Sequence, residues 1–596
     1  MRDFVKKHQL ALVISLLIGV LYVAPHLVFR LSLGDAYRGI PIMQTANEDE
    51  YLFRIQEILD GHPSLGSPVF FEYKNQPPLA PPVGEFFYAL PSILLGISPA
   101  TVIHWSRFFL PALLFFLAYL LIRRLSGDES KASLWAGVVG ALVITLGYDL
   151  VDYRTVLHYL AGTDSPGHFL LWSRPVNPIL GALFLFSLFL VALSLMERPH
   201  RPLPRIMLAA AFLALMFGSY FFSWGMALSV LAVLVGSLIL RKQYRTAGVL
   251  SLIVPLGIVF ALPYWLGAWK AAQHPEYAAS VLRSGMFLTH YPLENTLLLV
   301  ALLLYALILC FDFVQKRRQD IPYPIETWHL LTLSFLLGGF IAFDQQVITG
   351  KTIWPYHFVQ YTIPLSIITG FVLLARVVRT YSGTVWMSAI GFCATASVLF
   401  GIYTQGSTYH RFFAEYKDAQ QLRELYDTLN ATSGPCVVLE TGKPQDSSFD
   451  NAIPAFTHCD LYDSPWVFSL VPEERIIHNY FVRLFLNGVT AESIDAYLAE
   501  HEDDARGRLF TNWKGVFRVH EFPDFGDPML EERLAKLPEM YRAFLDQDPV
   551  SEINEYQLDY VVAYKPFDLK KVAILSSLQV VLETNTFALF KVEEPE

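Results

Sequence analysis

The sequence predicts a multi-span α-helical membrane protein that carries a soluble α/β or α+β domain at its C-terminal end. Hydrophobic residues make up 54% of the 596 residues and charged residues only 16%, which is too apolar for a soluble globular protein. Apolar runs of the length that crosses a bilayer, roughly 17–25 residues, recur from Leu10 to Thr404. Beyond Thr404 the chain becomes charged and contains no such run.

Short basic clusters between the apolar runs predict the orientation. Lys and Arg near the ends of spans face the cytoplasm under the positive-inside rule, and two apolar runs separate each cluster from the next, so the pattern gives about eleven spans with a cytoplasmic N-terminus. The spans are expected at Leu10–Phe29, Ala100–Ile122, Ser133–Tyr148, Pro175–Met196, Met207–Phe222, Gly225–Leu240, Val249–Trp269, Asn295–Val314, Trp328–Phe343, Phe358–Leu374 and Val385–Tyr403.

One apolar stretch, Glu85–Ile97, is about 13 residues long and therefore too short to cross the membrane. We expect it to lie on the outer surface as an interfacial helix, because a crossing here would turn every later basic cluster outward. Residues 30–99 then form one long external loop. The predicted domains are a membrane domain over residues 1–404 and an extracytoplasmic domain over residues 405–596.

The C-terminal domain has about 190 residues, a usual size for one domain. Its alternating and β-branched runs predict strands, and its longer periodic runs predict helices. The last of these runs forms a hairpin with Asn585 near the turn. Strands are expected at Cys436–Glu440, Gly515–Val519, Leu558–Val562 and Val580–Glu583, and helices at Ala491–His501 and Met529–Phe544.

Two of the four cysteines, Cys436 and Cys459, lie in this domain. An oxidising compartment would join them in a disulfide, and two free cysteines in a small core are the open alternative. No Cys/His spacing predicts a structural zinc site. The net charge of −10 is modest for this length, and no basic tract predicts nucleic-acid binding.

The side chains with chemical potential collect in the predicted outer loops. The first loop carries Glu48, Asp49 and Glu50, followed by the amphipathic run Tyr51–Asp60, for which Gly61 is a helix C-cap. A carboxylate can deprotonate an acceptor hydroxyl, while cations stabilise a departing phosphate. Such groups at the lipid boundary predict transfer from a donor whose leaving group is a lipid phosphate.

A set of short patterns follows the first span in a fixed order. Asp49-Glu50-Tyr51 comes first, then a helix ending in Leu59-Asp60-Gly61, then Lys74–Leu79 with the letters Lys-Asn-Gln-Pro-Pro-Leu, and then Arg-x-x-x-Pro at Arg107–Pro111. In this order and topology the chain resembles the GT-C superfamily of integral membrane glycosyltransferases, particularly the protein mannosyltransferase and aminoarabinose transferase branch. The likeness is detailed from Leu10 to Arg124, and the multi-span layout extends it over the chain.

The resemblance implies that Asp49 is the catalytic base, with Glu50 as its neighbour and alternate. Glu48 precedes the family's Asp-Glu pair and makes a run of three acidic residues. The position that aligns with the family's base therefore stays open by one residue. Family members that use a divalent cation bind it with acidic groups from two outer loops. Here those would be Asp49 with Asp152 or Asp149, and metal use stays open.

Five basic residues are candidates for binding the donor phosphate: Arg107, Arg174, Arg283, Lys351 and His357. Other roles remain open for most of them. Arg107 can instead pair with an outer-loop carboxylate, and Arg174 can anchor the helix that Pro175 starts. Lys351 and His357 also have the composition of ordinary interfacial anchors.

The predicted function is transfer of a hexose or pentose from a polyprenyl-phosphate donor to a lipid, glycan or protein acceptor, on the outer face of a prokaryotic cytoplasmic membrane. A cell envelope glycan is the expected product class. The chain has no cytoplasmic nucleotide-binding domain, and nucleotide sugars are cytoplasmic, so a lipid-linked donor is favoured.

Two alternatives belong to other classes. A transporter or flippase of a lipid-linked or small polar substrate predicts charges near mid-span and inverted repeats with broken helices, whereas these spans are nearly uncharged. A polysaccharide polymerase or ligase is expected to have its main catalytic loop late in the chain, rich in Arg and His. Here the acidic loop follows the first span directly.

Overall fold

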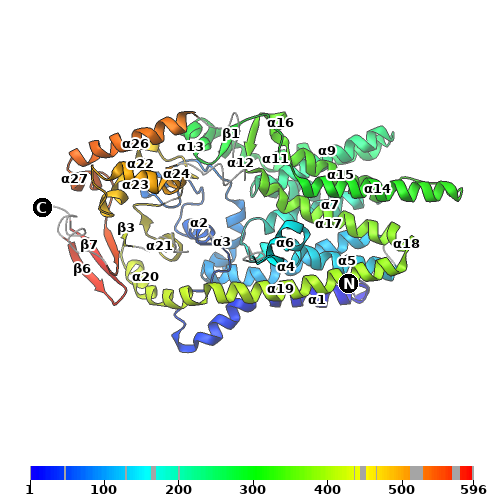
Figure 1. Cartoon of the computed structure of the whole chain (residues 1–596), viewed down its shortest axis with the longest axis horizontal. Coiled ribbons are helices and arrows are strands. Elements are labelled where there is room, and N and C mark those ends of the chain that lie inside the picture. Colours follow the sequence, from blue (N-terminus) through cyan, green and yellow to red (C-terminus); the bar gives the residue numbers. More distant parts are fainter. Residues whose placement is uncertain are drawn as a thin grey trace.

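The computed structural model describes residues 2–45, 48–127, 130–162, 169–198, 202–434, 436–442, 451–464, 466, 468–509, 528–566 and 578–593. In Figure 1 a long helical bundle occupies the right and centre, and a smaller domain with a sheet occupies the left. The N-terminus lies in the bundle and the C-terminus at the far left. The predicted fold class, a multi-span helical protein with a C-terminal α/β domain, is confirmed.

All eleven predicted spans coincide with apolar helices. Within the described part of the chain, seven helices are long and apolar enough to cross a membrane. They are α1 (Arg2–Leu33), α4 (Pro99–Leu125), α7 (Ile179–Glu197), α9 (Phe221–Leu240), α14 (Thr296–Arg318), the continuous helical run Pro355–Tyr381 that contains α17 (Val359–Leu373), and α19 (Gly383–Ala419).

The other four predicted spans are shorter or bent. The run expected over Val249–Trp269 is a pair of helical segments, Tyr244–Phe260 and Leu262–Ala272, bent by 61°. The break falls just before Pro263, whose ring nitrogen cannot donate the hydrogen bond that would continue the first helix. The remaining three are α5 (Lys131–Thr145), α8 (Leu203–Phe217) and α15 (Thr327–Phe343), and the bent pair is built from α10 (Tyr244–Ser251), α11 (Ile253–Phe260) and α12 (Leu262–Ala272).

The long segment between α1 and α4 contains the two helices that the sequence predicted. Helix α2 (Glu48–Leu59) begins earlier than the expected start at Tyr51, because the acidic residues form its first turn, where negative charge complements the helix dipole. Gly61 ends it with φ +100°, and the His62 N–H donates to the Glu57 carbonyl at 3.0 Å. The predicted C-cap is confirmed.

Helix α3 (Val83–Leu95) confirms the short apolar helix. One face of α3 is buried in the protein and includes Glu85 and Tyr88, while the other face is largely exposed. An amphipathic helix of this length fits a position in the membrane interface. Its exposed side chains are Phe86, Phe87, Leu90, Ile93, Leu94 and Leu95.

The predicted boundary between residues 404 and 405 lies inside α19, which has 37 residues and runs without a break to Ala419. In Figure 1 this helix follows the lower edge of the bundle toward α20 (Arg423–Asn430) and the C-terminal domain. The polypeptide therefore leaves the bundle as a helix that continues into the C-terminal part.

The C-terminal domain is built on a mixed sheet with strand order β4-β3-β5-β7-β6, in which β3 is parallel to β4 and β5, and β7 is antiparallel to β5 and β6. The hairpin β6–β7 turns through Asn585 as predicted, and the strand predicted at Gly515–Val519 lies outside the described residues. The strands are β3 (Val437–Thr441), β4 (Asp460–Leu461), β5 (Tyr560–Tyr564), β6 (Leu578–Glu583) and β7 (Phe587–Val592).

Several helices of this domain were not predicted, among them the short α21 (Ala452–Phe456) and the longer α22 (Glu473–Leu486). The two cysteines of the C-terminal domain, Cys436 and Cys459, are joined in a disulfide with their Cα atoms 4.8 Å apart, which resolves the alternative left open by the sequence. The other helices of the domain are α23 (Ile494–Glu500), α24 (Glu502–Leu509), α26 (Pro528–Asp546) and α27 (Pro549–Ile553).

Candidate functional site

Helix α2 lies between the helical bundle and the C-terminal domain (Figure 1). From the C-terminal side, α21 packs against α2, and the Trp466 ring meets the Phe53 ring edge to face at 5.3 Å between centroids. The Leu461 N–H donates to the Val69 carbonyl at 3.0 Å. The acidic first turn of α2 is therefore enclosed by both parts of the molecule.

Glu48 points into the helical bundle. Its buried carboxylate forms an ion pair with the buried guanidinium of Arg107 on α4, and it accepts a hydrogen bond from Thr45 Oγ1 at 3.0 Å. Arg107 Nε also donates to the Ser173 carbonyl at 3.3 Å. Of the roles open for Arg107, the pairing with an outer-loop carboxylate is the one that the structure contains.

Asp49 points in another direction, because successive residues of a helix are about 100° apart. Its buried Oδ2 accepts a hydrogen bond from the backbone N–H of Asn451 at 2.9 Å and lies 3.5 Å from Asn451 Nδ2. Asn451 directly precedes α21. The carboxylate that the sequence names as the base therefore contacts the C-terminal domain.

Arg174 lies beside the aromatic residue that follows the acidic run. Its guanidinium lies over the Tyr51 ring at 5.5 Å, and the negative potential of Tyr51 raises the pKa of Arg174 despite burial, with smaller contributions from Tyr220 and Glu50. The buried Nε of Arg174 has no hydrogen-bond partner among the described residues. A buried cationic hydrogen-bond donor of this kind can bind an anionic ligand.

Tyr220 directly precedes α9 and interacts electrostatically with Arg174. The Tyr220 hydroxyl lies 3.0 Å from His357 Nδ1 and donates to Gln360 Oε1 at 3.3 Å. Burial raises the pKa of Tyr220. The structure thus brings Tyr220 and His357 together with Arg174, whereas the Lys351 side chain is exposed.

Arg283, at the end of α13 (Tyr277–Arg283), is buried against the C-terminal domain. Its Nη2 donates to the backbone carbonyls of Ser469 at 3.3 Å and Val471 at 2.6 Å, and burial lowers its pKa to about 10. These contacts give Arg283 a role in joining α13 to the domain. Its predicted contact with the donor phosphate stays a prediction.

A buried ionic cluster lies next to the acidic turn. Lys74 Nζ is 2.6 Å from Glu57 Oε2 on α2 and 2.9 Å from Asp460 Oδ1 on β4. Burial raises the pKa of Asp460 to about 8, against the lowering effect of Lys74. Charges taken out of water need such partners, so Lys74, which the sequence analysis named only as part of a motif, ties α2 to the C-terminal domain.

A second buried pair connects α2 to the interfacial helix. Arg54 Nε lies 2.8 Å from Glu85 Oε1 on α3, and the Arg54 guanidinium also lies over the Trp466 ring at 5.7 Å. The sequence analysis missed this pair, as it missed Tyr220, Asn451 and Asp460. The available signal was Glu85, a charge in the otherwise apolar helical run of α3, because such a charge needs a buried partner; α2 is amphipathic, so Arg54 gave no comparable signal.

The metal site predicted on Asp49 and Asp152 stays untested. The Asp152 carboxylate accepts from Arg154 Nε and Nη2 at 2.9 Å each, and burial, with the nearby charge of Asp152, raises the pKa of Asp149 to about 6. Among the described residues, two groups of three metal-ligand side chains occur, and neither contains Asp49 or Asp152. These groups are Cys436, His458 and Cys459, and His478, Glu552 and Glu555.

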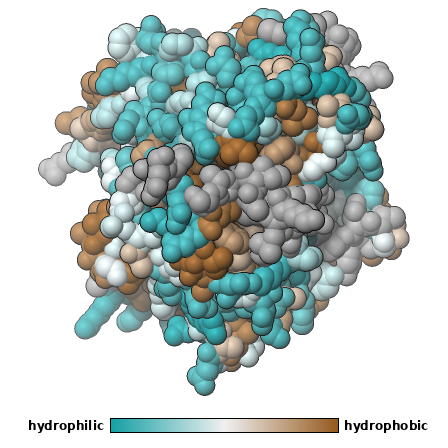
Figure 2. All heavy atoms as spheres, turned by 90° about the vertical axis from the view of Figure 1, so that its left-hand side faces the viewer, coloured by the Kyte–Doolittle hydropathy of each residue, from teal (hydrophilic) through white to brown (hydrophobic). Residues whose placement is uncertain are grey.

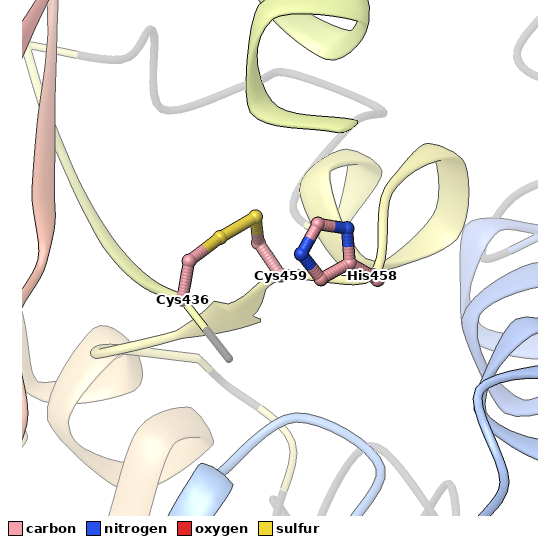
Figure 3. A group of neighbouring side chains, drawn as sticks. All are labelled: Cys436, His458 and Cys459. Atoms are coloured by element: carbon pink, nitrogen blue, oxygen red, sulfur yellow. A yellow bond between two sulfur atoms is a disulfide. The ribbon is translucent and has the colours of Figure 1, made fainter. Parts of the chain in front are cut away.

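The first of these groups is drawn in Figure 3, where the two cysteine sulfurs are bonded to each other beside the His458 ring. His458 Nε2 lies 3.0 Å from the Gly434 carbonyl oxygen. A cysteine binds a metal ion as its thiolate, and a disulfide offers no thiolate. The group is therefore a covalent crosslink in the C-terminal domain.

No family model and no curated protein matches the chain. Among solved structures, ArnT from Cupriavidus metallidurans in the apo state is 13% identical with a TM-score of 0.42, over 97% of this chain and 99% of that chain. A structure of the same protein bound to undecaprenyl phosphate is 12% identical with a TM-score of 0.41, over 97% and 99% of the two chains.

The archaeal oligosaccharyltransferase AglB from Archaeoglobus fulgidus, in complex with an inhibitory peptide and a dolichol-phosphate, is 13% identical with a TM-score of 0.45, over 94% of this chain and 69% of that chain. ArnT and AglB are both GT-C membrane glycosyltransferases, the superfamily that the sequence resembles. At these TM-scores the likeness carries no argument about chemistry.

Proposed function

We propose that the protein is a GT-C-type membrane glycosyltransferase that moves a sugar from a polyprenyl-phosphate donor to a lipid, glycan or protein acceptor. The observation that supports this best is the meeting of acidic and cationic side chains at one end of an apolar bundle. The acidic turn of α2 lies beside Arg107 and Arg174 there, under the C-terminal domain. A lipid-linked donor can enter such a site from the bilayer.

In the proposed reaction the Asp49 carboxylate removes the proton from the acceptor hydroxyl. The acceptor oxygen then forms a bond to the anomeric carbon, while the bond from that carbon to the phosphate oxygen breaks and polyprenyl phosphate leaves with the electron pair. One base and direct displacement invert the configuration. Arg174, with an unused buried N–H among the described contacts, would stabilise the charge on the leaving phosphate.

The three acidic residues are assigned different roles. Glu48, in its buried pair with Arg107, would hold the first turn of α2 on the bundle. Glu50 is only half-buried and acts electrostatically on Tyr51 and Arg174. The Asp49 carboxylate accepts a hydrogen bond from the C-terminal domain, which supports it as the group that meets an acceptor from outside the membrane.

The test is transfer of radiolabelled sugar from a panel of polyprenyl-phosphate hexoses and pentoses by the purified protein in lipid. Because a positioned base contributes roughly 10²–10⁴-fold, Asp49→Asn should lose about that factor in turnover while donor binding persists. Glu50→Gln should lose less, and Glu197→Gln, at the opposite end of the bundle, serves as the control. Equal turnover in the wild type and Asp49→Asn would reject Asp49 as the base.

The donor-phosphate role of Arg174 has its own test. Arg174→Gln should raise the KM for the donor more than it lowers kcat, and Arg174→Lys should recover part of the loss, because lysine restores the charge without the planar fork. An unchanged donor KM in Arg174→Gln would move the phosphate site elsewhere. Repeating the assay with a chelator decides whether a divalent cation is required.

We also propose a cytoplasmic N-terminus and an extracytoplasmic C-terminal domain in the cytoplasmic membrane of a prokaryote. The basic ends of the spans support this orientation. Arg317→Cys, at the end of α14, should react with a membrane-impermeant maleimide only after the membrane is opened. Asn430→Cys, in α20, should react in intact cells, and the reverse pattern would invert the topology.

A further inference from the structure

The C-terminal domain reaches the proposed base through one short segment, residues 451–464 with Trp466, which lies against α2. Within this segment Asn451 is buried, and its backbone N–H donates to Asp49 Oδ2 at 2.9 Å with its side-chain Nδ2 at 3.5 Å from the same oxygen. The two residues are 402 positions apart in the sequence. The contact is therefore a product of how the domain docks.

The side chain of Asn451 is itself held. Ser464, which is also buried, donates from its hydroxyl to Asn451 Oδ1 at 2.8 Å, and the Ser464 oxygen accepts from the Trp466 N–H at 3.2 Å. With its carbonyl oxygen bound to Ser464, the amide of Asn451 presents its NH₂ group toward Asp49. The orientation of this amide is thus fixed by a hydrogen-bond chain that starts at Trp466.

The segment that carries Asn451 is anchored on both sides. Asp460 pairs with Lys74 at 2.9 Å, Leu461 bonds to Val69 through the backbone at 3.0 Å, and Trp466 packs against Phe53 of α2. These contacts all connect the segment to the first external loop. The position of Asn451 relative to α2 is therefore determined by several independent contacts.

We propose that Asn451 is a positioning residue for Asp49, so that the C-terminal domain completes the catalytic site of the membrane domain. This inference rests on the proposed function of Asp49 as the base. Two N–H groups from one residue engage the same carboxylate oxygen of Asp49 and so fix the orientation of the carboxylate. A base held in one orientation loses less freedom in the transition state, so the effect should appear in kcat.

The orientation of the Asp49 carboxylate matters because charged and polar groups surround it. Beside Glu48 and Glu50 on α2, the buried tyrosines Tyr416 on α19 and Tyr426 on α20 interact with its charge. Carboxylates thus lie beside Asp49 on its own helix, and tyrosines of two other helices interact with its charge. Asn451 adds hydrogen-bond donors from the C-terminal side.

The experiment compares kcat and donor KM for Asn451→Ala, Asn451→Asp and Ser464→Ala, with Asn554→Ala as an exposed control in the same domain. Asn451→Ala keeps the backbone N–H at 2.9 Å and removes only the side-chain donor at 3.5 Å, so we expect a fall in kcat of about threefold to tenfold at unchanged donor KM. Asn451→Asp should fall further, because it keeps the size of the side chain and places a second carboxylate against Asp49. Ser464→Ala should lose less than Asn451→Ala.

A double-mutant cycle separates positioning from a merely structural role. In an Asp49→Asn background, Asn451→Ala should have no further effect on the residual rate, because the group that it positions is gone. Additive losses, or losses in kcat that follow the thermal unfolding temperatures of the variants, would overturn the positioning role.

The two proposals fail in different ways. Transfer by the wild type with wild-type kcat in both Asn451 variants would overturn the role of Asn451 and leave the proposed function intact. Absence of transfer by the wild type with every donor of the panel would overturn the proposed function, and the positioning role would fall with it.

Discussion

The two ends of the helical bundle differ in how they hold their charges. At the end under the C-terminal domain, Lys74, Glu57 and Asp460 are all buried and Lys74 has two carboxylate partners. At the opposite end, where the basic clusters lie, Arg124 pairs with Glu197 while their side chains are 27% and 37% exposed. In the cluster at the first end every ionic partner is buried, whereas at the second end each of the pairs Arg124–Glu197 and Lys316–Asp312 has at least one partly exposed partner.

At the first end the geometry of the ion pairs matters for stability. At the second end only the charge of the side chains matters, because it orients the spans. A buried pair is costly to form and very costly to break, so it persists only where several contacts enforce it. An exposed pair contributes little but still orients a span by its charge. Figure 2 views the molecule from the end that carries the C-terminal domain and shows a mainly hydrophilic surface, so the buried charges there lie beneath a polar cover.

The largest effect is expected for Lys74→Met. The substitution leaves the buried carboxyl groups of Glu57 and Asp460 without their cation, and removing one partner of a buried pair costs about 3–5 kcal/mol. Thermal unfolding of the purified protein should show this loss, and adding Glu57→Gln to the variant should recover part of it. Lys565→Met, which removes a partly exposed partner of Glu583, is the matched control, and equal losses in both variants would break the comparison.

A smaller loss is expected when the disulfide of the covered end is removed. Cys436 and Cys459 are 23 residues apart in the sequence, and a crosslink over a loop of this size is worth about 2–4 kcal/mol. Cys436→Ser with Cys459→Ser should therefore lower the unfolding temperature, as reductant should in the wild type. Reductant should leave the double variant unchanged, and an unfolding temperature in the double variant equal to that of the wild type would assign the crosslink no part in stability.

The covered end should also respond to pH. Because the folded pKa of Asp460 is raised to about 8 from 3.8, the folded state binds a proton that the unfolded state lacks between these values, and stability falls as pH rises through this window. The loss should exceed about 1.4 kcal/mol, the value of one pKa unit. Asp460→Asn should flatten the dependence measured by thermal unfolding from pH 4 to pH 9, and an equally steep curve in this variant would contradict the assignment.

The smallest effect is expected at the opposite end. Arg124→Gln removes one exposed ion pair and should change the free energy of unfolding by only about 0.2–1 kcal/mol, and less at high salt. Chemical denaturation in matched detergent would measure it. A loss as large as that of Lys74→Met would show that the two ends are not different in kind.

Much of the fold was predictable from residues close together in the chain. Apolar runs predicted all eleven helical segments, the short run Glu85–Ile97 predicted α3, and Gly61 predicted the end of α2. The hairpin β6–β7 followed from its turn. The bend before Pro263 and the unbroken course of α19 across the predicted boundary were missed, because hydropathy does not distinguish a broken helix from a straight one.

The sequence by itself therefore determined the helical class, the order of the spans and the acidic turn that begins α2, because hydropathy and helix termination act over a few residues. Only the tertiary structure decided which carboxylate meets which partner: Glu48 meets Arg107, and Asp49 meets Asn451 from the far end of the chain. Only the tertiary structure places Arg283 against backbone carbonyls of the C-terminal domain, while its contact with a donor phosphate stays a prediction. Such pairings depend on how distant segments dock, which no local pattern encodes.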